Sequence, residues 1–379
     1  MQLMKLSLFQ FRNYQEAEIH FSQGVHILYG KNGAGKTSIL ESIFYLALTR
    51  SFRSSQDRSL IHESRDMFRL QGEFSTQSDN KWRCSIAYSP KEGKRLLVDG
   101  QRIHRFADYI GEVPIVMLAP SDLQIVQAGP GLRRRFLDIL LSQSSKIYLH
   151  HLMQYKRSLK QRNQLLQAGN NVTVQTLAPW EETLVLNGAE IIRRRQETLA
   201  VLSEMAGEYY RELSQSRDSV ELVYRSDVLP EDAHETAAVY RRQFDKKRQK
   251  EILQHTTLIG PHRDDVAFLL NGKSMRSFAS QGEQKTMVVA LKLAEFHYLQ
   301  QQSQKAPILL FDDIFGELDA DRIQHLLRQL GNIGQVFVTT TSRNFFDKIP
   351  KQEFPTHYYH VCDGRIEFQE NVCGAGQIN

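Results

Sequence analysis

The stretch Gly30-Lys31-Asn32-Gly33-Ala34-Gly35-Lys36-Thr37 matches the phosphate-binding pattern G-x-x-x-x-G-K-[ST] at every fixed position. An apolar run at residues 25–29 precedes it and predicts a buried strand, and apolar residues recur at helical spacing over residues 36–48. A strand, this loop and a helix in that order are the context in which the pattern binds a nucleoside triphosphate. A glycine-rich turn that ends in Lys-Thr by chance is the alternative, and both flanking elements disfavour it.

The chemistry of this loop gives each part a role toward such a ligand. Its backbone N–H groups would curl around the β-phosphate, and the start of the following helix adds partial positive charge. Lys36 would reach the β- and γ-phosphates as a catalytic cation, and the Thr37 hydroxyl would bind Mg²⁺. We therefore expect ATP and Mg²⁺ as cofactors. The expected nucleotide-binding residues of the loop are Gly30, Lys31, Asn32, Gly33, Ala34, Gly35, Lys36 and Thr37.

A second candidate segment lies far downstream, at Ile308-Leu309-Leu310-Phe311-Asp312-Asp313. Four apolar residues predict a buried strand that delivers two carboxylates at its end. Asp312 would bind Mg²⁺, and Asp313 would orient the attacking water as a catalytic carboxylate. Taken alone, a strand capped by acidic turn residues is the commoner interpretation.

Two further segments accompany the aspartate pair. Ser280-Gln281-Gly282-Glu283-Gln284 stands at the start of a predicted helix, where Ser280 and Gly282 would form an anion-binding end for a γ-phosphate. Glu317-Leu318-Asp319 follows the aspartates, and residues 335–341 predict another buried strand, which ends in threonines. Each signal is weak by itself, so the interpretation depends on their order along the chain.

The remaining segments alternate between strand-like and helical patterns. Early strands are predicted at residues 6–11, 69–74, 82–88 and 95–98, and tight hairpin turns at Asp99-Gly100 and Asn271-Gly272. After Pro130 the apolar spacing predicts one long helix, and a second helix is expected to return antiparallel after Asn170-Asn171 and Pro179. Each would be roughly 50 Å long, and a strand is expected again near residues 257–259.

Composition narrows the class of protein without indicating a function. The chain has 379 residues, of which 41% are hydrophobic and 24% charged, as is typical of globular proteins. Its apolar runs are far shorter than the roughly 20 residues that span a bilayer, and its first residues do not form a signal peptide. Three scattered cysteines indicate no disulfide framework or zinc site. We expect a cytoplasmic protein without a membrane partner, and its net charge of +5 does not by itself indicate nucleic acid.

The order of these motifs resembles the ABC/SMC ATPases, and within them the RecF family. The residues that carry the narrower resemblance are Phe11-Arg12-Asn13-Tyr14, Asn32, Ala119-Pro120-Ser121-Asp122-Leu123, Arg133-Arg134-Arg135-Phe136-Leu137-Asp138, Gly260-Pro261-His262-Arg263-Asp264-Asp265 and Ser280-Gln281-Gly282-Glu283-Gln284. The resemblance implies an α/β fold. An ABC-type ATPase head with mixed and parallel sheets would comprise residues 1–125 and 258–379, and a helical arm (lobe II) would comprise residues 126–257.

The resemblance also implies function and partners. Arg12 would lie close to the nucleotide, and Ser280 with Gly282 would touch the γ-phosphate bound by a second copy, which gives an ATP-dependent homodimer. Members of this family bind single-stranded and duplex DNA at gap junctions, associate with a RecR-like mediator, help to load the recombinase in recombinational repair and support the SOS response. A weak, DNA-stimulated ATPase activity is implied with them.

Three departures from the general ABC pattern carry chemical consequences. Asp313 replaces the usual catalytic glutamate and is one methylene shorter, and Thr339-Thr340-Thr341 lacks the usual switch histidine. Hydrolysis should therefore be slow, because positioning supplies most of the rate enhancement in phosphoryl transfer. Gln281 replaces a glycine of transporter subunits, which argues against a transporter.

Alternative functions remain at this stage. An ABC-type ATPase coupled to a nuclease would need a further catalytic domain, which we do not expect, and a transporter subunit would need a membrane partner. Asp264 and Asp265 beside His262 could suggest a metal site, although a structural role is commoner for one acid pair. Basic clusters would offer a surface to DNA, or would be ordinary solvated helix faces: Arg133-Arg134-Arg135, Arg193-Arg194-Arg195, Arg241-Arg242 and Lys246-Lys247-Arg248.

Overall fold

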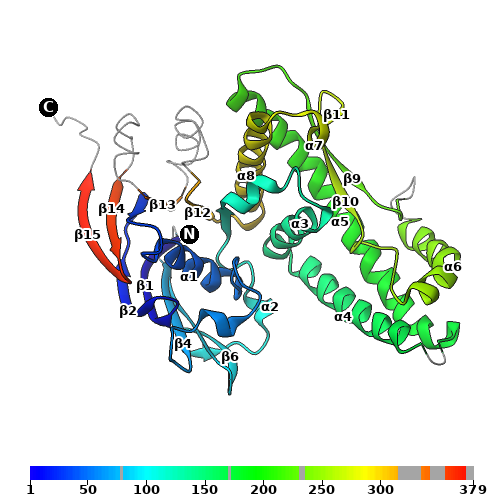
Figure 1. The fold of residues 1–379 in the computed structure, drawn as a ribbon, viewed down its shortest axis with the longest axis horizontal. Coiled ribbons are helices and arrows are strands. Elements are labelled where there is room, and N and C mark those ends of the chain that lie inside the picture. Colours follow the sequence, from blue (N-terminus) through cyan, green and yellow to red (C-terminus); the bar gives the residue numbers. More distant parts are fainter. Residues whose placement is uncertain (77–79, 170–171, 230–234, 315–333, 342–354, 373–379) are drawn as a thin grey trace. The chain divides into compact units, whose positions relative to one another are not determined.

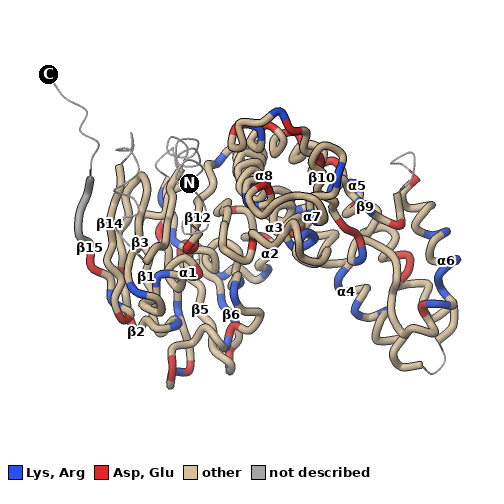
Figure 2. Tube along the Cα trace, turned by 45° about the horizontal axis from the view of Figure 1, so that its top comes forward, with Lys and Arg blue, Asp and Glu red and all other residues tan. Residues whose placement is uncertain are grey.

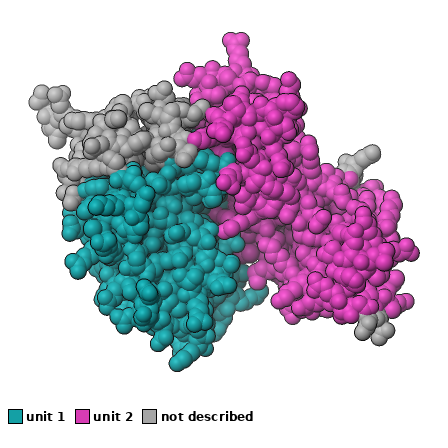
Figure 3. Space-filling model, viewed as in Figure 1, with its two compact units in different colours: residues 1–123, 292–379 teal, residues 124–291 magenta. Residues whose placement is uncertain are grey.

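The computed structural model describes residues 1–76, 80–169, 172–229, 235–314, 334–341 and 355–372, and the chain divides into two compact units (Figure 3). The first unit comprises Met1–Leu123 and Lys292–Asn379, and the second comprises Gln124–Leu291. From the sequence, the later boundary is expected at residues 257/258. The difference arises because residues 265–270 pair with a strand of the helical unit, so this segment stays with that unit.

Two six-stranded β-sheets form the framework of the first unit. One is antiparallel, in the order β2-β1-β4-β5-β6-β7, and the other, in the order β15-β14-β3-β13-β12-β8, is parallel except for β15. The strands are β1 (Gln2–Phe11), β2 (Tyr14–His20), β3 (Val25–Tyr29), β4 (Phe68–Ser75), β5 (Lys81–Ser89), β6 (Gly93–Val98), β7 (Gln101–Arg102), β8 (Ile115–Leu118), β12 (Ile308–Asp312), β13 (Val336–Thr340), β14 (Thr356–Cys362) and β15 (Arg365–Val372). Strands β8, β12 and β13 are buried throughout, as is typical of parallel strands covered on both faces.

Helix α1 (Lys36–Leu48) packs against strands of both sheets, including β4 and β13 (Figure 1). Every residue of α1 except Thr37 is buried. A helix that is buried on all sides belongs to the interior of a unit, and α1 therefore anchors the preceding loop firmly. The first unit also contains η1 (Asp57–Leu60), α2 (Phe106–Tyr109), most of η2 (Pro120–Gln124) and the C-terminal part of α8 (Gln281–Ser303).

The second unit is mainly helical, and its helices α4 and α5 lie side by side (Figure 1). Its elements are α3 (Pro130–Ser144), α4 (Lys146–Ala168), α5 (Val174–Ser214), α6 (Thr236–Gln254), α7 (Met275–Phe278), the N-terminal part of α8, and a sheet of β9 (Val220–Arg225), β10 (Asp265–Leu270) and β11 (Lys273–Ser274). The long helix predicted after Pro130 is instead two helices. Ser145 separates them, because its extended backbone breaks the helix and its hydroxyl accepts a hydrogen bond from the N–H of Tyr148. The predicted interruption at Pro179 is wrong, since Pro179 lies within α5, which is roughly 60 Å long.

Both predicted hairpin turns are confirmed. Asp99 and Gly100 have φ of 47° and 79°, and Asn271 and Gly272 have φ of 51° and 74°, as two-residue type I′ turns require. The strand expected at residues 257–259 is absent from this described segment. Side chains take the place of a strand partner there, because the N–H of Thr257 donates to Asn163 and the N–H of Leu258 donates to Glu251.

Candidate functional site

The loop between β3 and α1 is closely packed at its two ends and unobstructed at its centre. A Cβ at Gly30 would lie 2.1 Å from the carbonyl oxygen of Val361, and one at Gly35 would lie 2.4 Å from the Asn13 amide nitrogen. Around Gly33, which has φ of +82°, no atom of the described residues lies within 4 Å of such a Cβ. The loop therefore presents its backbone to open space at its centre, where a phosphate-sized ligand can approach the N–H groups.

Lys36 is buried inside the curl of its own loop. Its Nζ donates to the carbonyl oxygens of Gly30 at 2.6 Å and Lys31 at 2.9 Å. Burial lowers the pKa of Lys36, and the nearby carboxylates of Asp313 and Asp312 act in the opposite direction. The Lys36 ammonium group therefore lies near two carboxylates that come from a distant segment of the chain.

Thr37 and Asp312 are in direct contact, although 275 positions separate them in the sequence. The Thr37 Oγ1 donates to Asp312 Oδ1 at 2.7 Å, and Thr339 Oγ1 donates to the same oxygen at 2.8 Å. Asp313 follows with φ of +48°, and its N–H donates to Thr339 Oγ1 at 2.9 Å. A hydroxyl and a carboxylate side by side are hard oxygen donors, the ligand type that Mg²⁺ prefers, so these residues fit the expected metal.

These groups open into a cavity of about 610 Å³ in the first unit. Its lining residues are Arg12, Asn13, Asn32, Gly33, Gly35, Lys36, Thr37, Ser38, Arg53, Ser59, Ile61, His62, Glu63, Asp313 and Thr339. The cavity combines the loop, the lysine and the carboxylate end with a wall that the sequence analysis missed. That wall comes from residues 53–63, which carry no motif, and only the fold places them beside the loop.

The Arg12-Asn13-Tyr14 turn braces the loop from the side. Asn13 Nδ2 donates to the carbonyl oxygen of Ala34 at 3.0 Å, and the Tyr14 hydroxyl donates to that of Gly35 at 3.1 Å. Arg12 lines the cavity and binds the Glu41 carboxylate through two hydrogen bonds. The turn therefore supports the loop backbone and brings a cation to the cavity.

Ser280 and Gly282 lie in the second unit, at the start of α8. The Ser280 N–H donates to Glu283 Oε2 at 2.6 Å and the Glu283 N–H donates back to Ser280 Oγ at 3.3 Å, which is the pattern of a capping box. The Ser280 hydroxyl also donates to Glu283 Oε2, at 2.7 Å. Ser280 is exposed, so its donors are accessible to a ligand that displaces the Glu283 carboxylate. The predicted Glu317-Leu318-Asp319 segment lies outside the described residues.

Most of the basic clusters are neutralised by acidic neighbours, and Figure 2 shows the two signs interleaved along α5 and α6. Arg133 and Arg195 are buried and bind Asp265 and Asp138, each at 2.7 Å. Other ion pairs of these clusters lie nearer the surface: Arg193 with Glu190 and Glu197, Arg194 with Glu190, Arg241 with Glu182, Lys247 with Asp227, and Arg248 with Glu181 and Asp245. These runs therefore serve largely to stabilise the helical unit.

His262, Asp264 and Asp265 have structural partners. Burial raises the pKa of Asp264 to about 6, and the Tyr224 hydroxyl donates to its carboxylate at 2.5 Å. Burial lowers the pKa of His262 to about 4, and its Nδ1 lies 2.6 Å from the Tyr155 hydroxyl. In the part of the chain that the structure describes, no group of three or more His, Cys, Asp or Glu side chains is placed to hold a metal ion.

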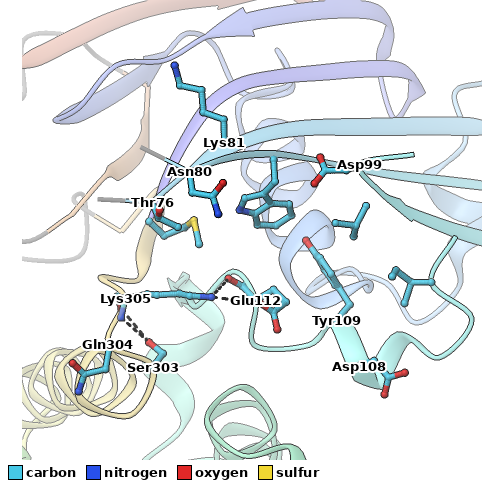
Figure 4. A pocket seen from close by; sticks show the side chains of 14 residues that line it. Thr76, Asn80, Lys81, Asp99, Asp108, Tyr109, Glu112, Ser303, Gln304 and Lys305 are labelled. Carbon is cyan, nitrogen blue, oxygen red and sulfur yellow. Dashed lines mark hydrogen bonds and ion pairs between the residues drawn. The ribbon is translucent and has the colours of Figure 1, made fainter. Parts of the chain in front are cut away.

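A second cavity, of about 810 Å³, lies in the first unit near the N-terminus (Figure 4). Trp82, Val98, Ile103 and Tyr109 give it apolar walls, and Lys305 reaches toward Glu112, with its Nζ 3.4 Å from a carboxylate oxygen. It contains no glycine loop to cradle phosphates. The chemistry of the 610 Å³ cavity makes that cavity the candidate site.

None of the helices that the structure describes is long and apolar enough to cross a membrane.

Comparisons with known proteins show the family to which the chain is similar. The model of the RecF/RecN/SMC N-terminal domain matches residues 2–360. The chain is 37% identical to the DNA replication and repair protein RecF of Salinibacter ruber, over 94% of this chain and 88% of that protein, and 36% identical to RecF of Bacillus mycoides, over 96% and 98%. A solved structure of the recombination mediator protein RecF with ATP in the RecFOR pathway is similar with a TM-score of 0.89 and 27% identity, over 97% of each chain. An Smc head bound to part of ScpA shares the fold, with a TM-score of 0.56 and 16% identity over 98% of each chain.

Proposed function

The chain belongs to the RecF family of DNA replication and repair proteins, and from this premise we propose that it binds ATP and acts on DNA in recombinational repair and replication-gap processing. One observation carries the proposal most directly. Thr37, which lines a cavity of about 610 Å³ with the buried Lys36, donates a hydrogen bond to Asp312 of β12. Relatives solved with ATP or with ATPrS support the choice of nucleotide.

Different residues of the cavity would bind different parts of a nucleoside triphosphate. The N–H groups of residues 30–35 and the Lys36 ammonium would hold the phosphates, with Arg12 at the cavity wall. Thr37 and Asp312 would hold Mg²⁺. When bound, the metal ion neutralises negative charge on the phosphates.

We infer slow hydrolysis that DNA stimulates. Asp313 lines the cavity and would orient a water molecule, although its side chain is one methylene shorter than glutamate. Thr339, which stands beside it, uses its hydroxyl to accept the Asp313 N–H and to donate to Asp312. Because the Thr339 hydroxyl is used to hold the ends of the strands, it does not serve as a general base. The chain's own groups thus favour tight binding over fast turnover.

The partners follow from the same proposal. Ser280 and Gly282 would contact the nucleotide of a second copy, so that ATP joins two chains as a homodimer. The dimer would bind single-stranded and duplex DNA at gap junctions through phosphate contacts, associate with a RecR-like mediator in the cytoplasm, help to load the recombinase and support the SOS response. The RecFOR pathway in the descriptions of the solved relatives supports this setting.

The test combines sedimentation with DNA binding. Saturating ATP should raise the dimer fraction, and binding to gapped DNA should exceed binding to single-stranded or duplex DNA when ATP is present. Lys36→Met should remove both effects, because the variant lacks the buried ammonium group. Lys91→Met is the matched control, since this exposed lysine lies at the turn between β5 and β6.

Two results would count against the proposal. A wild-type chain that stays monomeric at saturating ATP would overturn the nucleotide-gated dimer. Cleavage of plasmid DNA in the presence of Mg²⁺ would restore the nuclease alternative.

A further inference from the structure

Glu41 is a fully buried carboxylate that belongs to none of the motifs in the sequence. It lies on α1, about one turn beyond Lys36 and Thr37, and its side chain is 0% exposed. A buried carboxylate is costly unless it is paired and hydrogen-bonded. Because Glu41 lies so close to the nucleotide cavity, we expect it to have a role that offsets the cost of burying its carboxylate.

The contacts of Glu41 point toward two arginines of the cavity wall. Arg12 donates to both oxygens of the carboxylate, from Nη2 to Oε1 and from Nε to Oε2, each at 2.7 Å. The Ser51 hydroxyl also donates to Oε1, and Arg53 Nη1 lies 3.9 Å from Oε2. The two-pronged bond fixes the plane of the Arg12 guanidinium group, as a single contact would not.

Arg12 is held by its backbone as well as its side chain. Its φ is +54°, its N–H donates to the carbonyl oxygen of Leu60 at 2.7 Å, and its Nη1 donates to that of Ser59 at 3.0 Å. The side chain is still 22% exposed and lines the cavity, and Arg53 lines it with a side chain that is 48% exposed. Both arginines therefore keep surface available to a ligand while one edge is tied to Glu41.

We propose that Glu41 is a positioning residue, which holds the Arg12 and Arg53 guanidinium groups toward the cavity before a nucleotide arrives. The proposal rests on the function given above, because it takes the ligand to be a nucleoside triphosphate. A long arginine loses considerable rotamer freedom when it binds, and a partner that restricts it beforehand raises the affinity for the ligand. Glu41 acts through the arginines and does not itself touch the nucleotide.

A double-mutant cycle tests this role. The dissociation constant of ATP and the midpoint of urea unfolding are measured for the wild type, Glu41→Gln, Arg12→Lys and the double variant. Each single substitution breaks the two-pronged bond and should weaken ATP binding about tenfold, which is roughly 1.4 kcal/mol. The double variant should bind no more weakly than either single variant, because both changes remove the same arrangement.

Ser42→Ala is the matched control on the same helix. Ser42 is fully buried, and its hydroxyl donates to the carbonyl oxygen of Ile39 at 2.7 Å, within the helix itself. A general loosening of α1 would lower the unfolding midpoint of Ser42→Ala and weaken ATP binding with it, whereas the proposal expects its ATP affinity to stay at the wild-type value.

The outcomes separate the two proposals. Failure of the wild type to bind ATP would overturn the proposed function. If the wild type binds ATP, wild-type affinity in Glu41→Gln or additive losses in the double variant would overturn the positioning role alone. Should Glu41→Gln not fold, Arg12→Lys decides by itself, since it keeps the positive charge but loses the bidentate bond to Glu41 together with the Nη1 hydrogen bond to Ser59. Wild-type affinity in Arg12→Lys would then rule the role out.

Discussion

A buried arginine of the second unit and two arginines of the first unit are used in opposite ways. In the second unit, the Arg195 side chain is 3% exposed and every nitrogen of its guanidinium group has a protein acceptor: the hydroxyls of Tyr148 and Tyr224, the carbonyl oxygen of Pro261 and the carboxylate of Asp138. In the first unit, Arg12 and Arg53 are tied to Glu41 and remain partly exposed at a cavity. The same residue type holds a fold together when all its donors are used internally, and can serve a ligand when some are kept at a surface.

The largest expected effect comes from the buried arginine. Arg195→Met should destabilise the second unit by about 3–5 kcal/mol, because it leaves the largely buried Asp138 carboxylate without its main partner. Trp180 lies in this unit and Trp82 in the other, so urea unfolding followed by fluorescence in a Trp82→Phe background isolates the second unit. ATP affinity should not change. A comparable loss of ATP affinity in Arg195→Met would show that the arginines of the two units do not differ in this way.

The pH dependence of the second unit should depend on two buried groups of opposite effect. As pH falls below 6.5, the unfolded chain protonates His262 while the folded chain does not until about pH 4, so stability decreases. As pH falls below about 6, the folded chain protonates Asp264 while the unfolded chain does not until about pH 3.8, so stability increases. The two effects largely cancel in the wild type.

The substitution Asp264→Asn removes the stabilising effect of Asp264 protonation at low pH. Its stability should decrease by roughly 2 kcal/mol between pH 6.5 and pH 4.5, through His262 alone. Urea unfolding across this range with the Trp180 signal provides the measurement, and the wild type is the reference. A flat profile in the variant would show that His262 is not kept neutral by burial.

Arg53→Ala provides the counterpart in the first unit. ATP affinity should fall about threefold, because one partly exposed cation leaves the cavity wall, and the unfolding midpoint should barely change. Isothermal titration gives the affinity and urea unfolding gives the stability. A large loss of stability would place Arg53 among the structural arginines instead.

The smallest effect should come from a surface pair on α5. Arg193→Gln should change the free energy of unfolding by less than about 0.5 kcal/mol, although Arg193 contacts both Glu190 and Glu197. The measurement is the same urea titration, and Arg195→Met two residues away is the comparison. Similar losses in both variants would mean that burial does not distinguish these arginines.

The sequence was most informative where structure depends on local pattern. The loop at residues 30–37 could be predicted with its strand and helix, because glycine spacing and apolar periodicity are properties of consecutive residues. The Ser145 helix break was missed, since serine also occurs within helices and only its capping bond reveals the boundary. Residues near 257 looked like a strand, but side chains of α4 and α6 bind their backbone.

The sequence motifs of the candidate site could be predicted, but the residues that hold those motifs in place could not. Thr37 and Asp312 could be paired only through the resemblance to a known family, because nothing in composition or periodicity brings residues 275 positions apart together. Glu41 gave no signal, since a glutamate on a helix is usually a surface residue. Burial distinguishes Arg195 from Arg193, and in sequence they are the same residue two positions apart.

The position of β3 between β13 and β14 has a consequence for biosynthesis. On the ribosome, β3 and the loop emerge early, but their neighbouring strands are translated near the end of the message. At typical bacterial rates this delay is on the order of tens of seconds. The second unit is continuous in the chain and can fold during that wait, whereas the candidate site stays incomplete until translation is nearly finished. Nonsense mutations anywhere before β13 should therefore yield chains that cannot assemble this pocket.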